Sequence, residues 1–293
     1  MRGIPRTILF RLATSEGFER SVRTVPGGET FAYRLASRFV AGDTAEDAFA
    51  TAGRLAGDGL LSSIDFFGEN VTDPREADEV ADAYVALAAR LAADAPLGTF
   101  LSIDLSHIGI DEPGDGPRRR LERIAAALPA GARIQVGAEQ LARTDRILDA
   151  VLAVARAGGP VAATIQANLR RSPADAERLA EAGAPIRLVK GAYVETPALA
   201  HPWGDETDLA FIELAYALQR GGATVSLATH DPVIREALLP ALPGAGVEML
   251  LGVRPADLPT LAARGIPVRV YVPFGERWFR YAMRRAAESR GAR

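Results

Sequence analysis

Residues 161–189 read VAATIQANLRRSPADAERLAEAGAPIRLV, and this stretch contains the unit from which the fold can be deduced. It begins with the apolar run Val161–Gln166, continues through an amphipathic segment at Pro173–Ala182 and ends with a second apolar run at Ile186–Val189. Two short buried runs joined by a helical segment are typical of a βαβ unit with parallel strands. The same unit recurs on both sides of this stretch.

Eight apolar runs of this kind follow residue 59. They lie at Leu60–Phe67, Thr99–Leu105, Arg133–Gly137, Val161–Gln166, Ile186–Val189, Thr224–Ala228, Val247–Leu251 and Val268–Val272. Helical segments separate them, among them Pro74–Leu91, Leu141–Ala157 and Asp205–Gln219, and a last one, Glu276–Glu288, follows the eighth run. Eight such units predict an α/β fold, a closed (β/α)8 barrel of the TIM type. No Gly-x-Gly-x-x-Gly motif follows an early run, which argues against a Rossmann domain.

The first 59 residues have helical patterns instead, at Phe31–Val40 and Ala45–Leu55, with Gly42–Thr44 ending one and capping the next. We therefore expect a helical extension over residues 1–59 and a catalytic barrel over 60–293. The extension could cap the bottom of the barrel, mediate an oligomer or dock to a membrane surface. It has no strong basic amphipathic face, so stable membrane docking is not predicted.

The composition excludes several classes of function. The 293 residues are 48% hydrophobic and 24% charged, carry a net charge of −3 and include no cysteine and three histidines. This predicts a large core, no nucleic-acid partner, no disulfide and no thiolate or histidine metal site. The short basic run Arg118–Arg120 reads as a solvated face. No signal peptide and no apolar stretch of membrane-spanning length is evident, so we expect a cytoplasmic protein.

In a (β/α)8 barrel the site lies where the strands end. The polar side chains at these expected ends include Asp65, Asp104, His107, Gln166, Arg187, Lys190, Thr229, His230, Asp231 and Tyr271. Such a ring of donors and cations suits an anionic cofactor or substrate.

Three separate motifs carry a resemblance to a known family. They are RLVKGAYVE at residues 187–195, ATHD at 228–231 and YVPFGERWFRYAMRRAAE at 271–288. Their order and spacing resemble the monofunctional bacterial proline dehydrogenases, over about residues 39–288.

The resemblance implies FAD, bound noncovalently at the mouth of the barrel. By matching positions, the cofactor-binding residues are Gln166, Arg187, Lys190, Gly191, Ala192, Thr229 and His230. The substrate-binding residues are Asp104, Tyr193, Leu250, Tyr271, Arg284 and Arg285, and Arg187, Tyr271, Arg284 and Arg285 form the catalytic set. The guanidinium pair suits a carboxylate because each fork donates two parallel hydrogen bonds.

The implied reaction oxidises proline, or a proline-like cyclic or secondary amino acid, to the imine. Hydride leaves the carbon next to nitrogen for flavin N5, after the amine has lost its proton. Tyr271 favours an unhydroxylated ring. A quinone or another acceptor would then receive the electrons; the sequence identifies neither this acceptor nor the oligomeric state.

Two positions in the expected pocket depart from the family pattern. Asp104 stands in DLSHIG, where the family has Lys, and Gly137 stands in GAEQ, where it has Asp. Asn168 replaces a family aromatic residue. A change from Lys to Asp alters the charge by two units in a partly desolvated pocket. Three interpretations stay open: the chain oxidises proline poorly, it oxidises a related amine with an extra cationic group that Asp104 binds, or it keeps fold and flavin without activity.

Two rival interpretations come from other classes. Lys190 could form a Schiff base in an aldolase-type barrel. Alternatively, the chain could be a non-catalytic flavin-binding or interaction protein.

Overall fold

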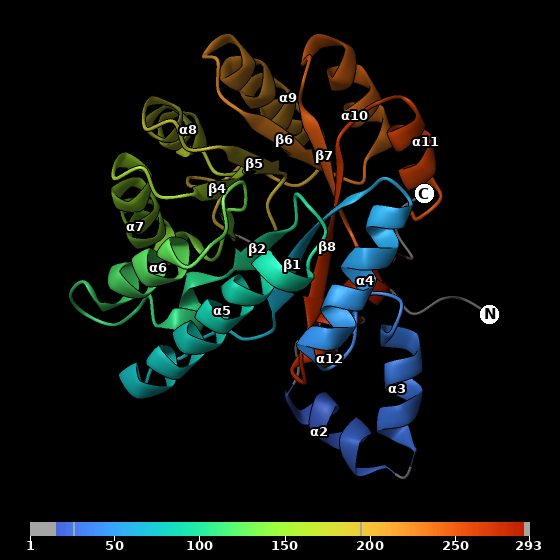
Figure 1. The fold of residues 1–293 in the computed structure, drawn as a ribbon. Coiled ribbons are helices and arrows are strands. Elements are labelled where there is room, and N and C mark those ends of the chain that lie inside the picture. Colours follow the sequence, from blue (N-terminus) through green and yellow to red (C-terminus); the bar gives the residue numbers. More distant parts are fainter. Residues whose placement is uncertain (1–15, 26, 194, 290–293) are drawn as a thin grey trace.

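The computed structural model describes residues 16–25, 27–193 and 195–289. Its centre is a closed barrel of parallel strands in sequential order, with β1 paired to β8 (Figure 1). The strands are β1 (Leu61–Phe66), β2 (Phe100–Ile103), β3 (Ile134–Val136), β4 (Val161–Gln166), β5 (Ile186–Val189), β6 (Val225–Ala228), β7 (Gly246–Leu250) and β8 (Val268–Phe274). The predicted (β/α)8 barrel is confirmed.

Helices follow the strands and surround the barrel. They are α5 (Pro74–Asp94), α6 (Gly116–Ala126), α7 (Thr144–Arg156), α8 (Ser172–Glu181), α9 (Asp205–Arg220), α10 (Pro232–Leu238), α11 (Asp257–Ala263) and α12 (Trp278–Ser289), with short 3-10 turns at Leu105–Ile108, Leu141–Arg143 and Leu239–Ala241. Aspartate before proline starts two of them: Asp73 accepts a hydrogen bond from the Arg75 amide, and Asp231 accepts from the Val233 amide. Both are N-caps, which satisfy amides that the helix leaves unpaired.

The main core lies between the strands and this ring of helices. The outward-facing residues of β2, Leu101 and Ile103, are fully buried, as is Tyr84 of α5. The Tyr84 hydroxyl donates to the Phe66 carbonyl at 3.1 Å, so its polar atom is satisfied inside the core. This bond joins α5 to the end of β1.

The N-terminal helices are α2 (Glu16–Thr24), α3 (Gly28–Ala36) and α4 (Ala45–Gly57). As predicted, Thr44 caps α4, with its hydroxyl accepting from the Asp47 amide and the Asp47 carboxylate accepting from the Thr44 amide. Helix α4 packs on the outside of β1 and β8 and shares the main core. It occupies the part of the outer ring that α12 leaves open.

Helices α3 and α12 pack together in a second apolar cluster. Ala32, Ala36 and Phe39 meet Trp278 and Phe279 there. Phe67, which directly follows β1, belongs to the same cluster, so α3 lies at the end of the barrel where the strands end. One place that the sequence allowed for the extension was the bottom of the barrel. For α3 this is wrong, because α3 lies at the opposite end. Residues 1–15 lie outside the described part of the chain.

The opposite end of the barrel is closed by a buried arginine. Arg269 Nη1 donates to the carbonyls of Ser62 and Gly98, both at 2.6 Å, and its guanidinium lies 3.5 Å from the centre of the Phe100 ring. Burial lowers the pKa of Arg269 to about 10. Arg269 therefore closes the end of the barrel where the strands begin, and this closure is called the Arg269 plug below. The open end is the one where the strands end.

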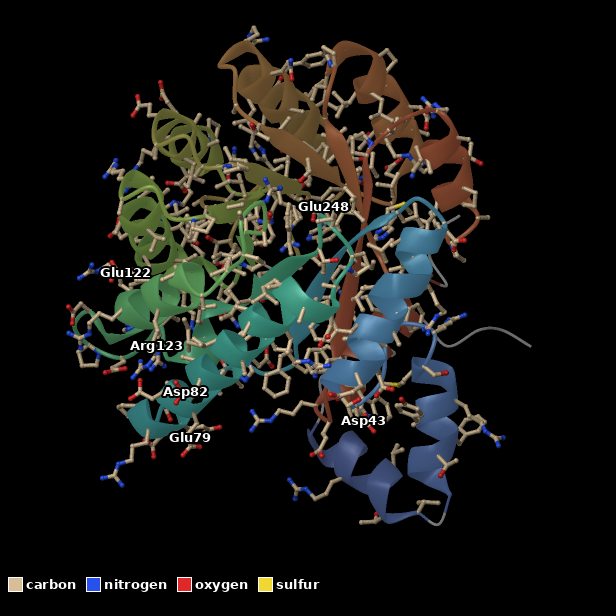
Figure 2. The ribbon with its side chains drawn as sticks, viewed as in Figure 1. Asp43, Glu79, Asp82, Glu122, Arg123 and Glu248 are labelled. Carbon is tan, nitrogen blue, oxygen red and sulfur yellow. The ribbon has the colours of Figure 1, made fainter. Side chains whose placement is uncertain are left out.

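The basic run at 118–120 departs from its prediction at Arg120 alone, because Arg119 is exposed and Arg118 is half-buried. All three arginines lie within α6, and Arg120 is buried, not solvated. Its guanidinium pairs with Asp78 and Glu112 and donates to the Ile108 carbonyl. Figure 2 contrasts surface charges such as Glu79, Asp82, Glu122 and Arg123 on outer helices with Glu248, which lies at the barrel. None of the described helices is long and apolar enough to cross a membrane.

Candidate active site

Arg187 extends from β5 into the barrel, below the mouth. Its Nε donates to Thr164 Oγ1 at 3.0 Å, and its Nη1 lies 3.5 Å from Glu248 Oε2. Ser226 Oγ donates to the other Glu248 oxygen at 2.6 Å. Residues from β4 to β7 therefore hold one buried cation in a fixed position. The sequence placed Arg187 at the site but gave no role to Glu248.

Lys190 follows β5 and is held by two carboxylates. Its Nζ lies 2.5 Å from Asp208 of α9 and 3.0 Å from Asp231. Burial raises the pKa of Asp231, but the hydrogen bond and charge of Lys190 outweigh it and the net pKa is lowered. The cation predicted to hold the cofactor thus has its charge compensated within the chain. Asp208 was not predicted, because no motif or spacing connects it to Lys190.

His230 is fixed to the neighbouring strand. Its Nε2 accepts a hydrogen bond from the Leu250 amide at 3.0 Å, which makes this nitrogen the unprotonated one. Burial, followed by the charges of Arg285, Arg235 and Arg254, lowers the pKa of His230 to about 4. A neutral imidazole therefore has its other nitrogen, Nδ1, as a donor. The Thr229 hydroxyl accepts from the Asp231 amide at 3.1 Å.

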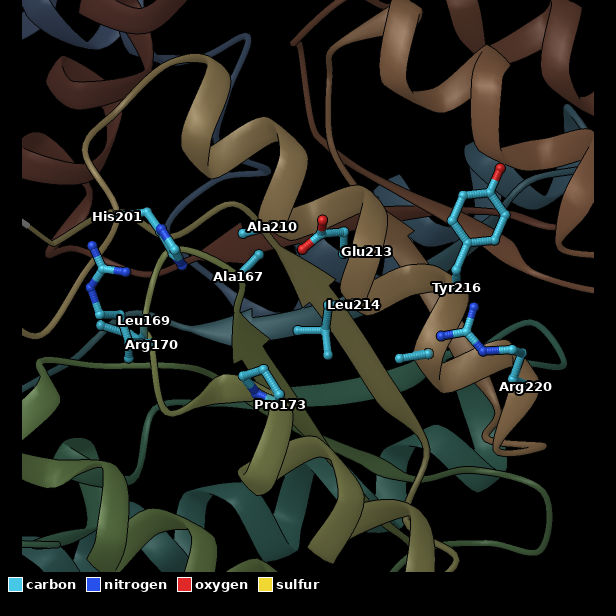
Figure 3. A pocket seen from close by; sticks show the side chains of 11 residues that line it. Ala167, Leu169, Arg170, Pro173, His201, Ala210, Glu213, Leu214, Tyr216 and Arg220 are labelled. Atoms are coloured by element: carbon cyan, nitrogen blue, oxygen red, sulfur yellow. The ribbon is translucent and has the colours of Figure 1, made fainter.

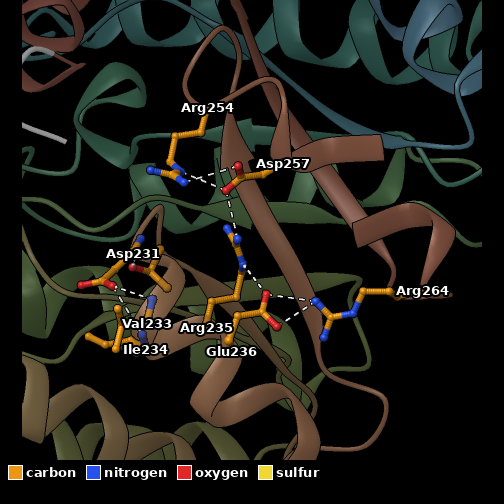
Figure 4. A network of polar contacts seen from close by, with 9 residues as sticks. Asp231, Val233, Ile234, Arg235, Glu236, Arg254, Asp257 and Arg264 are labelled. Atoms are coloured by element: carbon orange, nitrogen blue, oxygen red, sulfur yellow. Dashed lines mark hydrogen bonds and ion pairs between the residues drawn. The ribbon is translucent and has the colours of Figure 1, made fainter. Parts of the chain in front are cut away.

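A network of ion pairs supports the ends of β6 and β7 (Figure 4). Arg235 of α10 lies 2.9 Å from Asp257 of α11, and Arg254 lies 2.9 Å from the same carboxylate. Arg235 is buried, so these bonds compensate a desolvated charge. The network joins the helices that follow the two strands carrying His230 and Leu250.

The end of β4 brings amide groups to the same rim. Gln166 Nε2 donates to the Glu139 carbonyl at 3.0 Å, and its Oε1 accepts from the Ala192 amide at 3.4 Å. Asn168 Oδ1 is buried without a hydrogen-bond donor among the described residues. A β-carbon at Gly191, where φ is +112°, would lie 1.9 Å from this oxygen, so only glycine allows the approach.

Tyr271 and Asp65 are joined across β8 and β1. The Asp65 carboxyl is hydrogen-bonded to Tyr271 and to Ser102. Burial raises the pKa of Asp65 to about 7, although these two bonds and the charge of Arg187 oppose the shift. Tyr271 is half-buried, and burial followed by the charge of Asp65 raises its pKa.

Helix α12 approaches this pair from above. The Tyr281 ring lies 6.0 Å from that of Tyr271, and the Arg285 guanidinium lies 5.5 Å from the centre of the Tyr281 ring. This places Arg285 near the mouth, and its role in binding the substrate stays a prediction. The side chain of Arg284 lies outside the described residues, so its predicted role stays a prediction. Tyr193 and Leu250, both half-buried, follow β5 and end β7.

The two departures, Asp104 and Gly137, lie in contact. Asp104 directly follows β2, and a β-carbon at Gly137, directly after β3, would lie 1.9 Å from Asp104 Oδ1. Burial and the charges of Glu139 and Asp65 raise the pKa of Asp104 well above its usual range. The neighbouring carboxylate of Glu139, by contrast, has a cationic partner, because Arg143 Nη1 donates to it at 2.8 Å.

A cavity of about 470 Å³ lies elsewhere (Figure 3). It lies between α8 and α9, with Pro173 on one side and Leu214, Tyr216 and Arg220 on the other. It does not include the residues assigned to the site. Among the described residues no group of three or more histidine, aspartate or glutamate side chains is arranged to hold a metal ion.

A family model for proline dehydrogenase matches residues 48–293. The chain belongs to the proline dehydrogenase family. Proline dehydrogenase 1 of Bacillus subtilis (strain 168) is 34% identical over 262 residues, which cover 86% of each chain. Proline dehydrogenase of Deinococcus radiodurans is 33% identical over 270 residues, 88% of this chain and 87% of the relative. The assignment confirms the predicted family and supports an oxidoreductase acting on a CH–NH bond.

Solved structures agree on the fold. Proline utilization A of Bdellovibrio bacteriovorus, inactivated by N-propargylglycine, matches with a TM-score of 0.80 at 20% identity. The match covers 96% of this chain but 36% of that protein, so this chain spans about a third of its length. At this identity the likeness shows the barrel fold alone.

Proposed function

We propose that this chain is an FAD-dependent dehydrogenase that oxidises L-proline, or a closely related cyclic secondary amino acid, to the imine. The family membership supports a flavin enzyme of this type. The observation that carries the proposal is the arrangement of Arg187, Lys190, His230, Tyr271 and Arg285 around one barrel mouth. These residues come from distant segments, and the fold brings them to one end.

The β4–β6 side of the mouth fits a flavin. The orphaned Asn168 Oδ1 is an acceptor that needs an N–H donor, and the flavin ring has one. Neutral His230, through Nδ1, is a donor of the kind that oxygen and nitrogen atoms of such a ring accept. Gln166 and Arg187 complete the proposed ring-binding set, and Lys190, Gly191, Ala192 and Thr229 the set for the rest of the cofactor.

When bound, the flavin accepts the hydride. The substrate must lose a proton from nitrogen and a hydride from the adjacent carbon, which together leave a C=N double bond. We assign the substrate carboxylate to Arg285 and Arg284, and the ring to Tyr193, Leu250 and Tyr271. The bond between Tyr271 and Asp65 fixes the aromatic wall, and fixed walls supply orientation, which contributes strongly to rate. The Arg269 plug keeps water from entering from below.

The Schiff-base alternative finds no support at Lys190. Two carboxylates, those of Asp208 and Asp231, bind its Nζ, so the nitrogen is engaged in ion pairs and is not directed at a carbonyl carbon in the barrel. A non-catalytic flavin protein is the remaining rival, and it differs in one measurable property: no amine would reduce its flavin.

The test is a visible spectrum of the purified protein, followed by anaerobic addition of L-proline. A flavin spectrum that bleaches supports the proposal. A flavin that no cyclic or secondary amino acid bleaches supports the non-catalytic rival. A colourless protein that FAD does not reconstitute contradicts the proposal. The electron acceptor, a quinone or another, and the cytoplasmic location remain predictions.

A further inference from the structure

The carboxyl of Asp104 is a polar group without an internal partner. It accepts no hydrogen bond from any residue that the structure describes. Three carboxylates, of Glu139, Asp65 and Glu69, act on it unfavourably, and Arg187 supplies a favourable charge. Asp65, on the adjacent strand, has two hydrogen-bond partners within the chain.

Gly137 makes the position of this carboxyl possible. Its amide donates to the Ile103 carbonyl at 2.8 Å, which fixes the backbone at the end of β3. Because any β-carbon there would fall 1.9 Å from Asp104 Oδ1, the carboxyl occupies space that other residues would fill. The two departures from the family pattern therefore lie against each other, and the absence of a side chain at Gly137 leaves the space that the Asp104 carboxyl occupies.

This side of the barrel holds more polar groups than the chain satisfies. The Ser63 hydroxyl, one inward-facing position below Asp65 on β1, is fully buried and has no hydrogen-bond partner among the described residues. A buried hydroxyl without a partner costs about 1–3 kcal/mol, and the half-buried Asp104 carboxyl also lacks a donor among the described residues. A ligand that donates hydrogen bonds, or carries a positive charge, removes this cost.

The reacting nitrogen of the substrate is a poor match for this carboxyl. Hydride leaves only when that nitrogen is neutral, and a nearby carboxylate would hold it in the ammonium form. The substrate carboxylate is also a poor match, because an anion there would be held next to Asp104, Asp65 and Glu139 and would gain no cationic partner from them. A second donor or cationic group on the ring satisfies Asp104 without opposing the reaction.

We propose that Asp104, with Gly137 providing its space, selects a cyclic secondary amino acid that carries a second amino group on its ring. Asp104 is then the specificity-determining residue of the site. This inference rests on the proposed function for the reaction, but it makes a separate statement about binding.

The test uses the holoenzyme with three probes: L-proline, the diastereomers of 4-amino-L-proline, and 4-methyl-L-proline as a neutral control of similar shape. Anaerobic flavin reduction gives the rate for each, and the shift in thermal midpoint gives binding without turnover. We expect the wild type to prefer an amino-substituted probe over the methyl one by at least about tenfold, a difference of about 1.4 kcal/mol.

Asp104→Asn keeps the shape and removes the charge. We expect it to abolish this preference, because an amide cannot ionise to pair with a ring ammonium, whereas Asp104 can do so when a cation binds. Asp149→Asn is the matched control, since Asp149 pairs with Arg178 on the outer helices and should leave the preference intact.

A wild type that binds the methyl and amino probes equally overturns the inference, whether or not the variants fold. So does an unchanged preference in Asp104→Asn. A flavin that is bleached by none of the probes contradicts the proposed function, and the thermal shifts then still decide the inference.

Discussion

The charged side chains in the two halves of the barrel mouth differ in whether they have partners within the chain. On the β4–β7 side, Lys190 has two carboxylate partners, Arg187 has Thr164 and Glu248, and His230 is bonded to the Leu250 backbone. On the β2–β3 side, Asp104 has no such partner among the described residues. The charged groups of the first half are compensated within the chain, and the Asp104 carboxyl is not. We propose that the first half holds the cofactor and that the second half decides the substrate.

Removing a charge from the paired half, on the β4–β7 side, should cause the largest loss of activity and of stability. Arg187→Ala removes the cation at the centre of this half and leaves Glu248 buried with Ser226 as its partner. We expect kcat/KM for the preferred substrate to fall by about 1,000-fold, and the free energy of unfolding to fall by about 3 kcal/mol because a buried charge loses its partner. Steady-state kinetics and urea denaturation measure the two effects.

A double variant distinguishes these effects. Arg187→Met with Glu248→Leu removes both charges, so stability should recover while activity stays low. Full activity in Arg187→Ala would show that this half of the mouth does not take part in the reaction.

Neutralising Asp65 should have the next largest effect, and it depends on pH. The folded-state pKa of Asp65 is raised from 3.8 to about 7, so the folded protein binds this proton more tightly than the unfolded chain. The stabilising contribution is complete below about pH 4 and is lost as pH rises to 7. Asp65→Asn should therefore gain stability over the wild type across this window, by about 4 kcal/mol.

The difference between the two proteins is the quantity to measure, by urea denaturation from pH 4 to 8. Burial lowers the pKa of His107 and of His230 to about 4, so both residues destabilise the fold towards acid pH. They act equally in the wild type and in the variant and cancel in the difference. A difference that does not change with pH would contradict the raised pKa of Asp65.

The contact between Asp104 and Gly137 should give the smallest of the three effects. Gly137→Ala places a methyl group against the Asp104 carboxyl, and we expect a loss of about 1–2 kcal/mol in the free energy of unfolding. In an Asp104→Ala background the same change should cost almost nothing, because the carboxyl is gone. Additive effects in this double-mutant cycle would show that the two positions are independent.

Most of the fold could be predicted from the sequence, because buried strands and amphipathic helices have different periods. The weakest predicted strands, 133–137 and 247–251, correspond to β3 (Ile134–Val136) and β7 (Gly246–Leu250). The place of α4 in the outer ring could not be predicted, since periodicity shows which face is apolar and not what covers it. For the same reason Arg120 was assigned to a solvated face.

The sequence could predict which residues lie together at the mouth of the barrel but not which side chains pair there, and the roles of these residues stay predictions. Motif matches identified Arg187, Lys190 and His230, and the structure places them at one mouth. The partners Asp208 and Glu248 come from distant segments that no motif connects. The contact between Asp104 and Gly137 depends on the register of β2 and β3, where Leu101 pairs with Ile134, and sequence alone does not give that register.

The most direct test of the separation between the two halves is the rate of anaerobic flavin reduction by L-proline in Asp104→Lys with Gly137→Asp. This double variant restores the family's pair on the altered half and leaves the β4–β7 half untouched. If the altered half sets substrate choice, the rate with L-proline should rise at least about tenfold, with flavin bound as in the wild type. An unchanged or slower rate, in a folded variant that keeps its flavin, would contradict the account.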